Sequence, residues 1–253
     1  MQTVTLTPKR SPVISIEAEM ITPDVFAGKS DAEIGAIPAW EGNEEITLAD
    51  VFDVAVDGSA DAAGTKIIID GNVPRVKRIG EAMTAGEIVV KGDVDMRCGA
   101  LMSGGSITVE GNADSWVGRE MTGGEILVKG NATYYAGGGY RGETCGMRGG
   151  KLTIEGDVLD YLGEHMCGGE ILVKGNARLL PGVLNWSGTI TIEGDTTLPG
   201  GEMKSGTIFV KGKVLEMLPS YKDEGTEEVD GVTYRKYTGD LSRNGEGVLY
   251  VSV

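Results

Sequence analysis

The stretch Gly124–Ala132, which reads GEILVKGNA, sets the pattern of this 253-residue chain. Close variants of it occur eight times, and each contains a glycine that closes a short apolar run. The closing glycines are nearly evenly spaced, apart from one longer step between Gly130 and Gly156. Their positions are Gly71, Gly92, Gly111, Gly130, Gly156, Gly175, Gly194 and Gly212. A regular period of about 19 residues predicts a solenoid of stacked coils.

Each repeat places two apolar residues on one face by strand alternation, as a buried β surface prefers. The sequence therefore predicts an all-β fold, a right-handed parallel β-helix of about eight coils. We expect residues 65–215 to form the coils of a single domain, with capping segments at 1–64 and 216–253. The inward pairs are Ile67/Ile69, Ile88/Val90, Ile107/Val109, Ile126/Val128, Leu152/Ile154, Ile171/Val173, Ile190/Ile192 and Ile208/Val210.

The two ends differ from the repeats in their patterning. Alternation over residues 1–16 predicts a β-hairpin or edge strands, and Thr22 before Pro23 predicts a short helix start. Residues 46–56 indicate a strand, or a helical turn followed by a strand. Residues 248–253 are expected to form a final strand that closes the second end of the rod.

Three further features recur at fixed places in the repeats. Glycines six residues before the strand-opening glycine predict corners with positive φ: Gly80, Gly99, Gly118, Gly163, Gly182 and Gly200. Asn or Asp follows the closing glycine in seven of the eight repeats and is expected to form hydrogen bonds along the stack. A methionine column predicts interior packing rather than a soft-metal site, with Asn185 at the one departure. Its members are Met83, Met102, Met121, Met147, Met166 and Met203.

The formal charge of −15 is concentrated at the ends of the chain. Residues 1–64 carry 12 acids and 3 bases, whereas residues 65–215 carry 18 acids and 16 bases. No basic patch exists that would neutralise phosphates, so we expect no nucleic-acid partner. The absence of a leader and of a long apolar run predicts a cytoplasmic protein that does not bind membranes.

No catalytic set is evident. His165 is the only histidine, which excludes a histidine-rich metal site, and a structural role is expected for it. The cysteines are Cys98, Cys145 and Cys167, an odd count without a CxxC pair. This count argues against a disulfide framework, a structural zinc site and an iron–sulfur cluster. We expect no catalytic, cofactor-binding or metal-binding residue in this chain.

The residue before each closing glycine alternates in sign along the chain. Opposite charges one repeat apart would pair across neighbouring strands, so one repeat must correspond to one coil. We interpret this charge ladder as structural and solvated. Its members are Asp70, Lys91, Glu110, Lys129, Glu155, Lys174, Glu193 and Lys211.

Two residues earlier, on the same outward face, an apolar residue recurs in the lysine-bearing repeats. These residues are Val89, Leu127, Leu172 and Phe209. An exposed apolar column on a flat sheet is a liability unless it is covered. We expect this face to bind a partner, although simple exposure and cover by the chain's own ends remain open.

The longest repeat carries its extra residues at 133–145, including Tyr134, Tyr135, Tyr140 and Arg141. Aromatic and arginine side chains on a long loop favour partner contact. A tolerated insertion is the main alternative. The run Gly137–Gly139 also leaves a ligand site open, but it lacks the strand, helix start and Lys-Ser/Thr of a phosphate loop.

The repeat pattern GxxMxGGxIxVxG(N/D) resembles the glycine-repeat β-helix of two families. These are the C-terminal domain of the glutamate synthase large subunit and the C subunit of formylmethanofuran dehydrogenase. The second resemblance also rests on Leu6–Lys9, Glu17–Glu19, Ile21–Ser30 and Phe52–Val54, so it covers essentially the whole chain. The coil lengthened at 133–145 departs from the family pattern.

The resemblance to the dehydrogenase family implies a scaffold in the methanogen complex that reduces CO2 and couples it to methanofuran. Its implied partners are a molybdenum- or tungsten-pterin subunit, an amidohydrolase-like subunit with a metal-dependent hydrolase site, and ferredoxin-type subunits with iron–sulfur clusters. Two alternatives are the C subunit of a formyltransferase/hydrolase complex and a free-standing structural solenoid.

Overall fold

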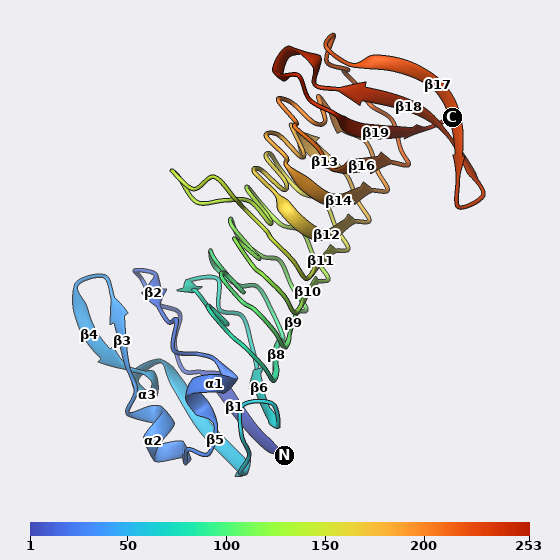
Figure 1. The fold of residues 1–253 in the computed structure, drawn as a ribbon. Coiled ribbons are helices and arrows are strands. Elements are labelled where there is room, and N and C mark those ends of the chain that lie inside the picture. The colour runs from blue at the N-terminus through green and yellow to red at the C-terminus, as the bar shows by residue number, and fades with distance from the viewer.

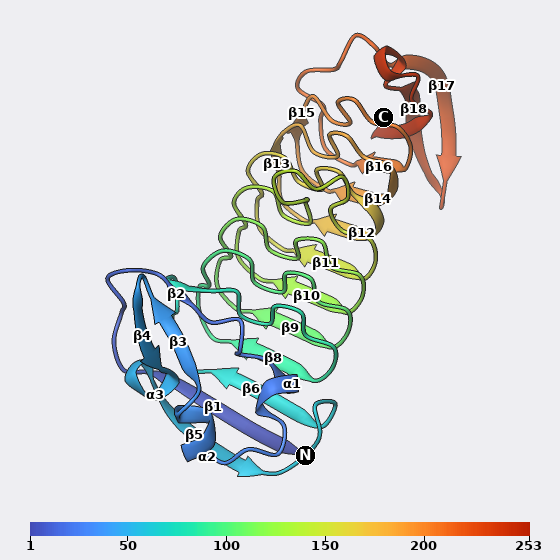
Figure 2. The same ribbon diagram turned by 60° about the vertical axis from the view of Figure 1, so that its left-hand side comes forward.

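The computed structural model describes residues 1–253 and is mostly β, with few and short helices. One strand from each of the eight repeats enters a large sheet, and consecutive repeats pair in parallel (Figures 1 and 2). One repeat therefore corresponds to one passage of the chain through the sheet, as the alternating charges predict. These strands are β6 (Thr65–Ile69), β8 (Glu87–Val90), β9 (Ser106–Val109), β10 (Glu125–Val128), β11 (Lys151–Ile154), β12 (Cys167–Val173), β14 (Ser187–Ile192) and β16 (Thr207–Val210).

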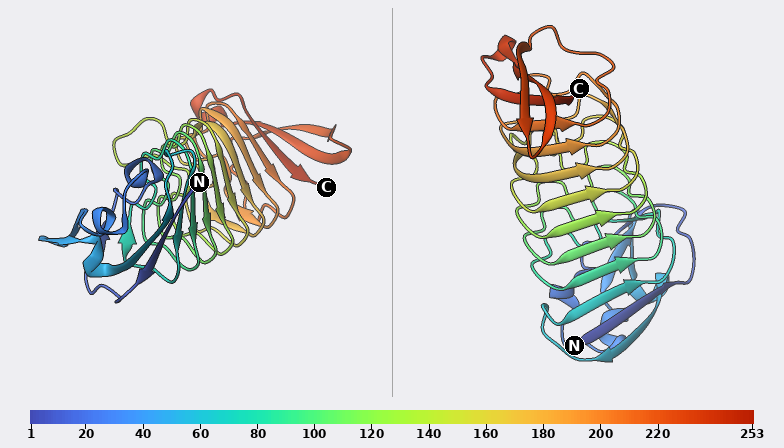
Figure 3. Two further views of the ribbon diagram at one scale, coloured as in Figure 1. Left: turned by 90° about the horizontal axis from the view of Figure 1, so that it is seen from below. Right: turned by 90° about the vertical axis from the view of Figure 1, so that its right-hand side faces the viewer.

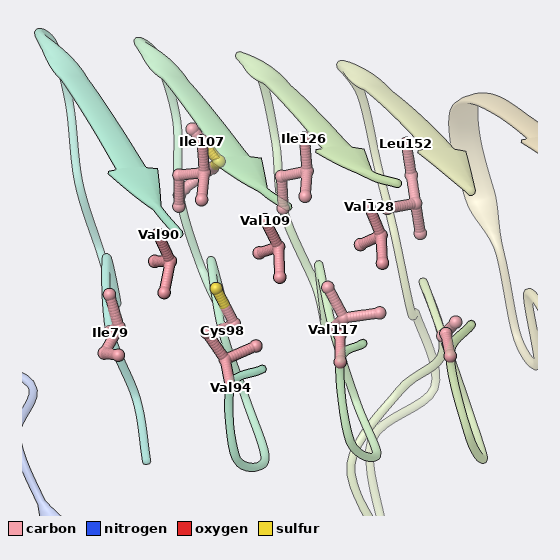
Figure 4. Close-up of a cluster of buried hydrophobic side chains, with 14 of the residues drawn as sticks. Ile79, Val90, Val94, Cys98, Ile107, Val109, Val117, Ile126, Val128 and Leu152 are labelled. Carbon is pink, nitrogen blue, oxygen red and sulfur yellow. The ribbon is translucent and has the colours of Figure 1, made fainter. Parts of the chain in front are cut away.

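The predicted inward pairs line up as apolar columns in the interior. Figure 4 shows Ile107, Ile126 and Leu152 side by side on successive strands, each at most 1% exposed. A further column on the return segments contains Cys98 and Val117, also nearly fully buried. Continuous burial of this kind supplies the main apolar contribution to stability.

A second parallel line of contacts runs along the rod beside the sheet. It consists of single bridges such as Val94–Ala113 and of the short strands β13 (Ala177–Leu179) and β15 (Thr196–Thr197). Next to it, each Asn or Asp side-chain oxygen accepts a hydrogen bond of 2.7–2.9 Å from a main-chain N–H one repeat further on. This confirms the predicted bonding along the stack. The acceptors are Asn72, Asp93, Asn112, Asn131, Asp157, Asn176 and Asp195.

The corners also follow the sequence. All six predicted corner glycines have positive φ, between 64° and 73°, and Gly137 takes this place in the long repeat with φ 67°. An alanine Cβ at Gly99 would lie 2.4 Å from Cδ1 of Ile126, so the corner is tight as well as left-handed. The six column methionines and Asn185 are fully buried, as expected of interior packing.

The N-terminal strand is not the hairpin or edge strand that its pattern predicted. β1 (Gln2–Pro8) lies inside the large sheet, parallel to β6 and antiparallel to β5 (Phe52–Gly58). Pairing with β6 sets Val4 beside Ile67, so β1 extends the interior column by one strand. A small second sheet has the order β4-β3-β2-β7. Its strands are β2 (Ile16–Glu17), β3 (Pro38–Glu41), β4 (Glu44–Thr47) and β7 (Val76–Lys77).

Three short helices belong to the same segment. The predicted helix start is confirmed, because α1 (Pro23–Phe26) begins at Pro23 and the hydroxyl of Thr22 accepts a hydrogen bond from Val25 N. α2 (Asp31–Gly35) has a capping box between Ser30 and Glu33. α3 (Leu48–Val51) leads directly into β5, so the helical turn followed by a strand is correct.

The C-terminal segment adds strands at the other end of the sheet. β19 (Gly247–Ser252) pairs in parallel with β16, as expected of a closing strand. β18 (Val232–Gly239) and β17 (Lys222–Val229) follow as an antiparallel hairpin, and η1 (Leu241–Arg243) connects β18 to β19. The hairpin projects from the rod (Figure 3). The longest α-helix, α2, has 5 residues, so none of the helices could span a lipid bilayer.

Candidate partner-binding surfaces

The outward apolar column lies on the outer face of the large sheet. Val89, Leu127 and Leu172 are half-buried there, between fully buried neighbours that point inward. Leu127 is flanked across the sheet by Thr108 and Thr153, and these residues line a hollow of about 250 Å³. The three side chains thus present a shallow apolar strip separated by threonines.

Phe209 does not belong to this open strip. Its ring stacks on Tyr250 at 4.9 Å between centroids and meets the edge of Tyr234 at 5.6 Å. Tyr250 and Tyr234 come from β19 and β18, so the chain's own C-terminal strands cover the strip at this end. Cover by the chain's own end, the alternative left open for this column, therefore applies in part to Phe209, and its docking role stays a prediction. The strand alternation predicted that Phe209 points outward, but it could not predict contacts with residues of later strands.

The charge ladder forms four separate ion pairs beside the strip. Each lysine bonds to the acid of the repeat before it, with N–O distances of 2.6–3.2 Å, and not to the acid that follows. The pairs are Lys91–Asp70, Lys129–Glu110, Lys174–Glu155 and Lys211–Glu193. The hydrogen bond from Lys174 lowers the pKa of Glu155, and the same contact raises the pKa of Lys174. These groups are exposed and engaged within the chain, so the ladder contributes structure rather than chemistry.

The long repeat projects on the side of the rod away from the labelled sheet strands (Figure 1). The main chain of Gly139 donates to the carbonyl of Glu164, and that of Gly146 donates to the carbonyl of His165. The N–H of Tyr140 donates to a carboxylate oxygen of Glu120 at 2.9 Å. The extra residues therefore rest against the corners of neighbouring repeats and do not reach the apolar strip.

An aromatic stack lies beneath this loop. The rings of Trp116, Tyr135 and Tyr161 are parallel within 9° and 5.1 Å apart from centroid to centroid. All three residues have φ between 60° and 64°, two residues before a corner glycine. Non-glycine residues adopt this conformation only at a cost, and stacking over successive repeats offsets it. Tyr135 is therefore part of the rod's own packing.

Tyr140 covers the end of the stack. Its ring meets the edge of Trp116 at 5.7 Å, and the guanidinium groups of Arg97 and Arg119 lie 4.7 and 5.0 Å from its centroid. Such cation–π contacts favour a fixed position for the ring. Tyr134 lies outside the stack, with its centroid 5.9 Å from the guanidinium of Arg178. Tyr134 and Tyr140 remain 38% and 37% exposed, and Arg141, which follows Tyr140 in the chain, is exposed as well.

A small hollow of about 130 Å³ separates the loop from the stack. Arg141, Glu164 and His165 line it, and burial raises the pKa of Glu164. Nδ1 of His165 and Nε1 of Trp116 are buried without a hydrogen-bond partner. A space of this size suits a few water molecules, because pockets for metabolites measure roughly 300–1,000 Å³. The hollow is therefore too small to favour a metabolite-binding site in the loop, which the sequence had left as one alternative.

The cysteines differ from the prediction. Cys145 and Cys167 form a disulfide bond that ties the end of the loop to the next repeat, whereas the odd count argued against a disulfide. Cys145 lies in the lengthened repeat, so the repeat spacing does not predict which residue of the next repeat it faces. Cys98 is the free cysteine and belongs to an interior column, where burial raises its pKa to about 12. Cys98 therefore behaves as a small apolar residue.

Replacing Cys145 by serine is expected to free the loop without unfolding the rod. The bond closes a chain separation of 22 residues, and a loop near this length corresponds to about 3 kcal/mol in the chain-entropy model. Amide hydrogen exchange at Tyr140, Glu143 and Gly146, whose N–H groups are hydrogen-bonded in the loop, should rise at least tenfold, while the interior strands keep their protection. A thiol reductant added to the unsubstituted chain should reproduce the change. Unchanged exchange in both samples would contradict the tethering role.

The chain contains no group of three or more His, Cys, Asp or Glu side chains that could hold a metal ion. Sequence reasoning missed Arg97, Trp116, Arg119 and Tyr161, which together hold the loop. All four residues could have been found by their position in the repeat, because each lies one or two residues from a corner glycine. Aligning the repeats on that glycine would have shown an aromatic run at Trp116, Tyr135 and Tyr161.

Comparison with known proteins places the chain in a family. No family model matches it. The C subunit of the tungsten-containing formylmethanofuran dehydrogenase 2 from Methanococcus maripaludis is 51% identical over 95% of this chain and 93% of its own length. The chain belongs to the C-subunit family of formylmethanofuran dehydrogenases. The corresponding protein of Methanothermobacter thermautotrophicus is 53% identical over 38% of this chain, and that match spans about a third (36%) of the relative's length.

The fold is also shared with a solved complex. A chain in the crystal structure of the formyltransferase/hydrolase complex from Methylorubrum extorquens, in complex with methylofuran, superposes with a TM-score of 0.89. The identity is 30%, over 98% of this chain and 99% of that chain. Family members named as molybdenum-containing also match. The chain is therefore similar to C subunits named for tungsten-containing and for molybdenum-containing enzymes, and to a chain of a solved multi-subunit complex.

Proposed function

We propose that this chain is the non-catalytic scaffold subunit of a tungsten- or molybdenum-containing formylmethanofuran dehydrogenase, an oxidoreductase complex. The near-full-length match to the Methanococcus maripaludis protein carries the proposal. In such a complex a pterin-metal subunit reduces CO2, and an amidohydrolase-like partner couples the product to methanofuran. Ferredoxin-type subunits supply the electrons, so all cofactors reside in the partners.

The contacts within the chain support a structural role. Its regularly placed charges are engaged in ion pairs, and its aromatic corner packs on itself. We propose that the repeats wind as a right-handed parallel β-helix over residues 65–215. The segments 1–64 and 216–253 would then cover its two ends, which otherwise expose unpaired backbone.

The apolar strip of Val89, Leu127 and Leu172 is the proposed docking face for a partner subunit. Its half-buried side chains lie on a flat sheet, and no aromatic ring packs over them as Tyr234 packs against Phe209. The exposed Tyr134, Tyr140 and Arg141 form a second proposed contact on the other side of the rod. A scaffold that holds two partners needs two such faces.

The docking face is tested by the double substitution Leu127→Glu and Leu172→Glu. Two charges on the strip should weaken capture of partner subunits by the tagged chain at least tenfold, because each would be desolvated in the interface. Leu101→Glu is the matched control, because Leu101 is an exposed leucine at a corner of the rod and not on the apolar strip. Glutamate is tolerated at this corner position, since Glu120 and Glu202 occupy it in other repeats. Intact assembly in a folded double variant would count against this face.

The formyltransferase/hydrolase complex is the second candidate, because the solved chain from that complex has nearly the same fold. Purification from the native source separates the two. Partner subunits with bound tungsten or molybdenum would support the dehydrogenase. Formyltransferase activity without either metal would support the second candidate, and a homopolymer alone would contradict both.

A further inference from the structure

The large sheet ends in two edge strands, β17 and β5, and the two edges differ. Along β17 three of the four acids pair with cations of the same hairpin, in Lys222–Glu224, Arg235–Asp223 and Lys236–Glu227. Such a charged, internally paired edge resists the addition of another strand. β5 has one comparable contact, between Lys9 and Asp53 at 3.2 Å. β5 is therefore the less protected edge.

The register of β5 shows which of its main-chain groups are free. Lys9 N donates to the carbonyl of Val51, and the antiparallel pairing continues with Thr7 opposite Asp53. Because hydrogen-bonded pairs alternate in an antiparallel ladder, every second residue from Asp53 bonds to β1. The N–H and C=O groups of Val54 and Val56 then point away from the sheet. No other segment of the chain forms a hydrogen bond with these groups.

Two hollows follow this free edge. The first has a volume of about 410 Å³ and is lined by α2, α3 and the start of β5, including Phe52 and Val54. The second, of about 360 Å³, is lined by Val56 and Gly58 at the end of β5. Asp31 lines both, so together they run along the whole strand. Figure 2 shows β5 beside α2 at the end of the rod.

The side chains of β5 divide between an apolar and an acidic face. Val54 and Val56 are half-buried against the core, on the face that carries Leu6 and Val4 of β1. Asp53 and Asp57 are exposed on the opposite face, and Asp57 has no ion pair. The surrounding segment 1–64 is itself acidic, with 12 acids against 3 bases. A complementary strand would carry apolar residues toward the hollows and basic residues toward the aspartates.

A second copy of this chain does not meet that requirement. β5 itself carries two acids and no basic residue, so it cannot supply the basic side chains in any register. In the antiparallel register centred on Ala55, Asp53 of one copy would also lie directly opposite Asp57 of the other. Like charges directly opposite each other on a sheet are destabilising. The charge of the edge therefore favours a different chain with basic side chains.

We propose that the free edge of β5 accepts an extended strand from a partner chain, with alternating apolar and basic residues. The strand would extend the sheet by hydrogen bonds to Val54 and Val56 and place its apolar side chains in the two hollows. This site lies at the end of the rod and is separate from the apolar strip on the sheet face. The inference therefore holds or fails independently of which complex the chain joins.

A synthetic peptide tests the site on the full chain. A capped heptapeptide that alternates lysine and valine should slow amide hydrogen exchange at Val54 and Val56 at least tenfold at saturation. Exchange at Asp53 and Ala55, whose amides already bond to β1, should not change. The same peptide N-methylated on its β5-facing residues should give no protection. Unchanged exchange with the first peptide, or equal protection by the N-methylated one, would overturn the proposal.

Charge reversal tests the recognition of the partner. Asp57→Lys should weaken binding of the lysine–valine peptide at least tenfold and should create binding of a glutamate–valine peptide. Glu228→Lys is the control, because Glu228 is exposed on the opposite edge strand β17 and has no ion pair. Equal effects of the two substitutions would mean that net charge alone governs binding, and the proposed site would be rejected.

Discussion

Replacing Gly124 by alanine is expected to destabilise the chain by about 2–5 kcal/mol, the sum of a conformational and a packing cost. Gly124 lies directly before β10 with φ 80°, a conformation that costs an L-residue roughly 1–2 kcal/mol. The added Cβ would also lie 2.7 Å from Cε of Met102 and 2.8 Å from the carbonyl oxygen of Gly105. Backbone cannot move aside without breaking the parallel ladder, so overpacking adds about 1–3 kcal/mol.

Gly231→Ala separates the two contributions. Gly231 has nearly the same φ, 76°, but nothing in the hairpin lies within 4 Å of the position that an added Cβ would take. Its replacement should cost only the conformational part. Urea denaturation of both variants measures the difference, with the midpoint of Gly124→Ala well below that of Gly231→Ala. Similar midpoints would show that the close approach of the coils does not constrain this glycine.

Replacing Met121 by asparagine is expected to cost about 2.5–6 kcal/mol, the sum of lost burial and an unpaired donor. Met121 is fully buried in the methionine column, and losing its burial removes about 1.5–3 kcal/mol. Asn185 occupies this column in another repeat and shows how a buried asparagine is hydrogen-bonded there. Oδ1 of Asn185 accepts from Ser187 N, but its buried Nδ2 has no partner. An unpartnered donor of this kind costs about 1–3 kcal/mol.

The reciprocal substitution Asn185→Met should raise stability by about 1 kcal/mol, because it removes the unpartnered amide. Ser187 N keeps an acceptor, since the carbonyl of Met166 lies 3.3 Å away. Thermal unfolding followed by circular dichroism would compare the two variants. Opposite shifts in Tm are expected. A loss of stability in both would mean that Asn185 has a structural role that methionine cannot replace.

The repeats were predictable because their signals are local. Alternation within one short strand identified the inward Ile126 and Val128, and the even spacing of the closing glycines set the parallel register. The corner glycines were found for the same reason, since only a residue without a side chain fits a left-handed corner that also touches an isoleucine. The parallel strands of the repeats thus followed from the sequence without knowledge of contacts across the chain.

The features that were missed depend on distant residues. β1 alternates like any edge strand, and its place inside the sheet depends on pairing with β6, which follows only after the whole N-terminal segment. The cover over Phe209 depends on Tyr234 and Tyr250. The disulfide joins Cys145 to Cys167 because the lengthened loop folds back, which the count of cysteines does not reveal. The open apolar strip was predicted, but its C-terminal limit was not.

The four ion pairs have a consequence for the position of a partner along the rod. Lysines and outward apolar residues both recur every second repeat, so the sheet face has a translational period of about 10 Å, twice the strand spacing. A partner displaced by two repeats would meet nearly the same pattern of charge and apolar surface. Sliding must therefore be prevented by parts that do not recur, namely the lengthened loop and the two ends. If a partner binds the proposed docking face, the repeated strip would supply most of the contact area and the parts that do not recur would fix the position of the partner.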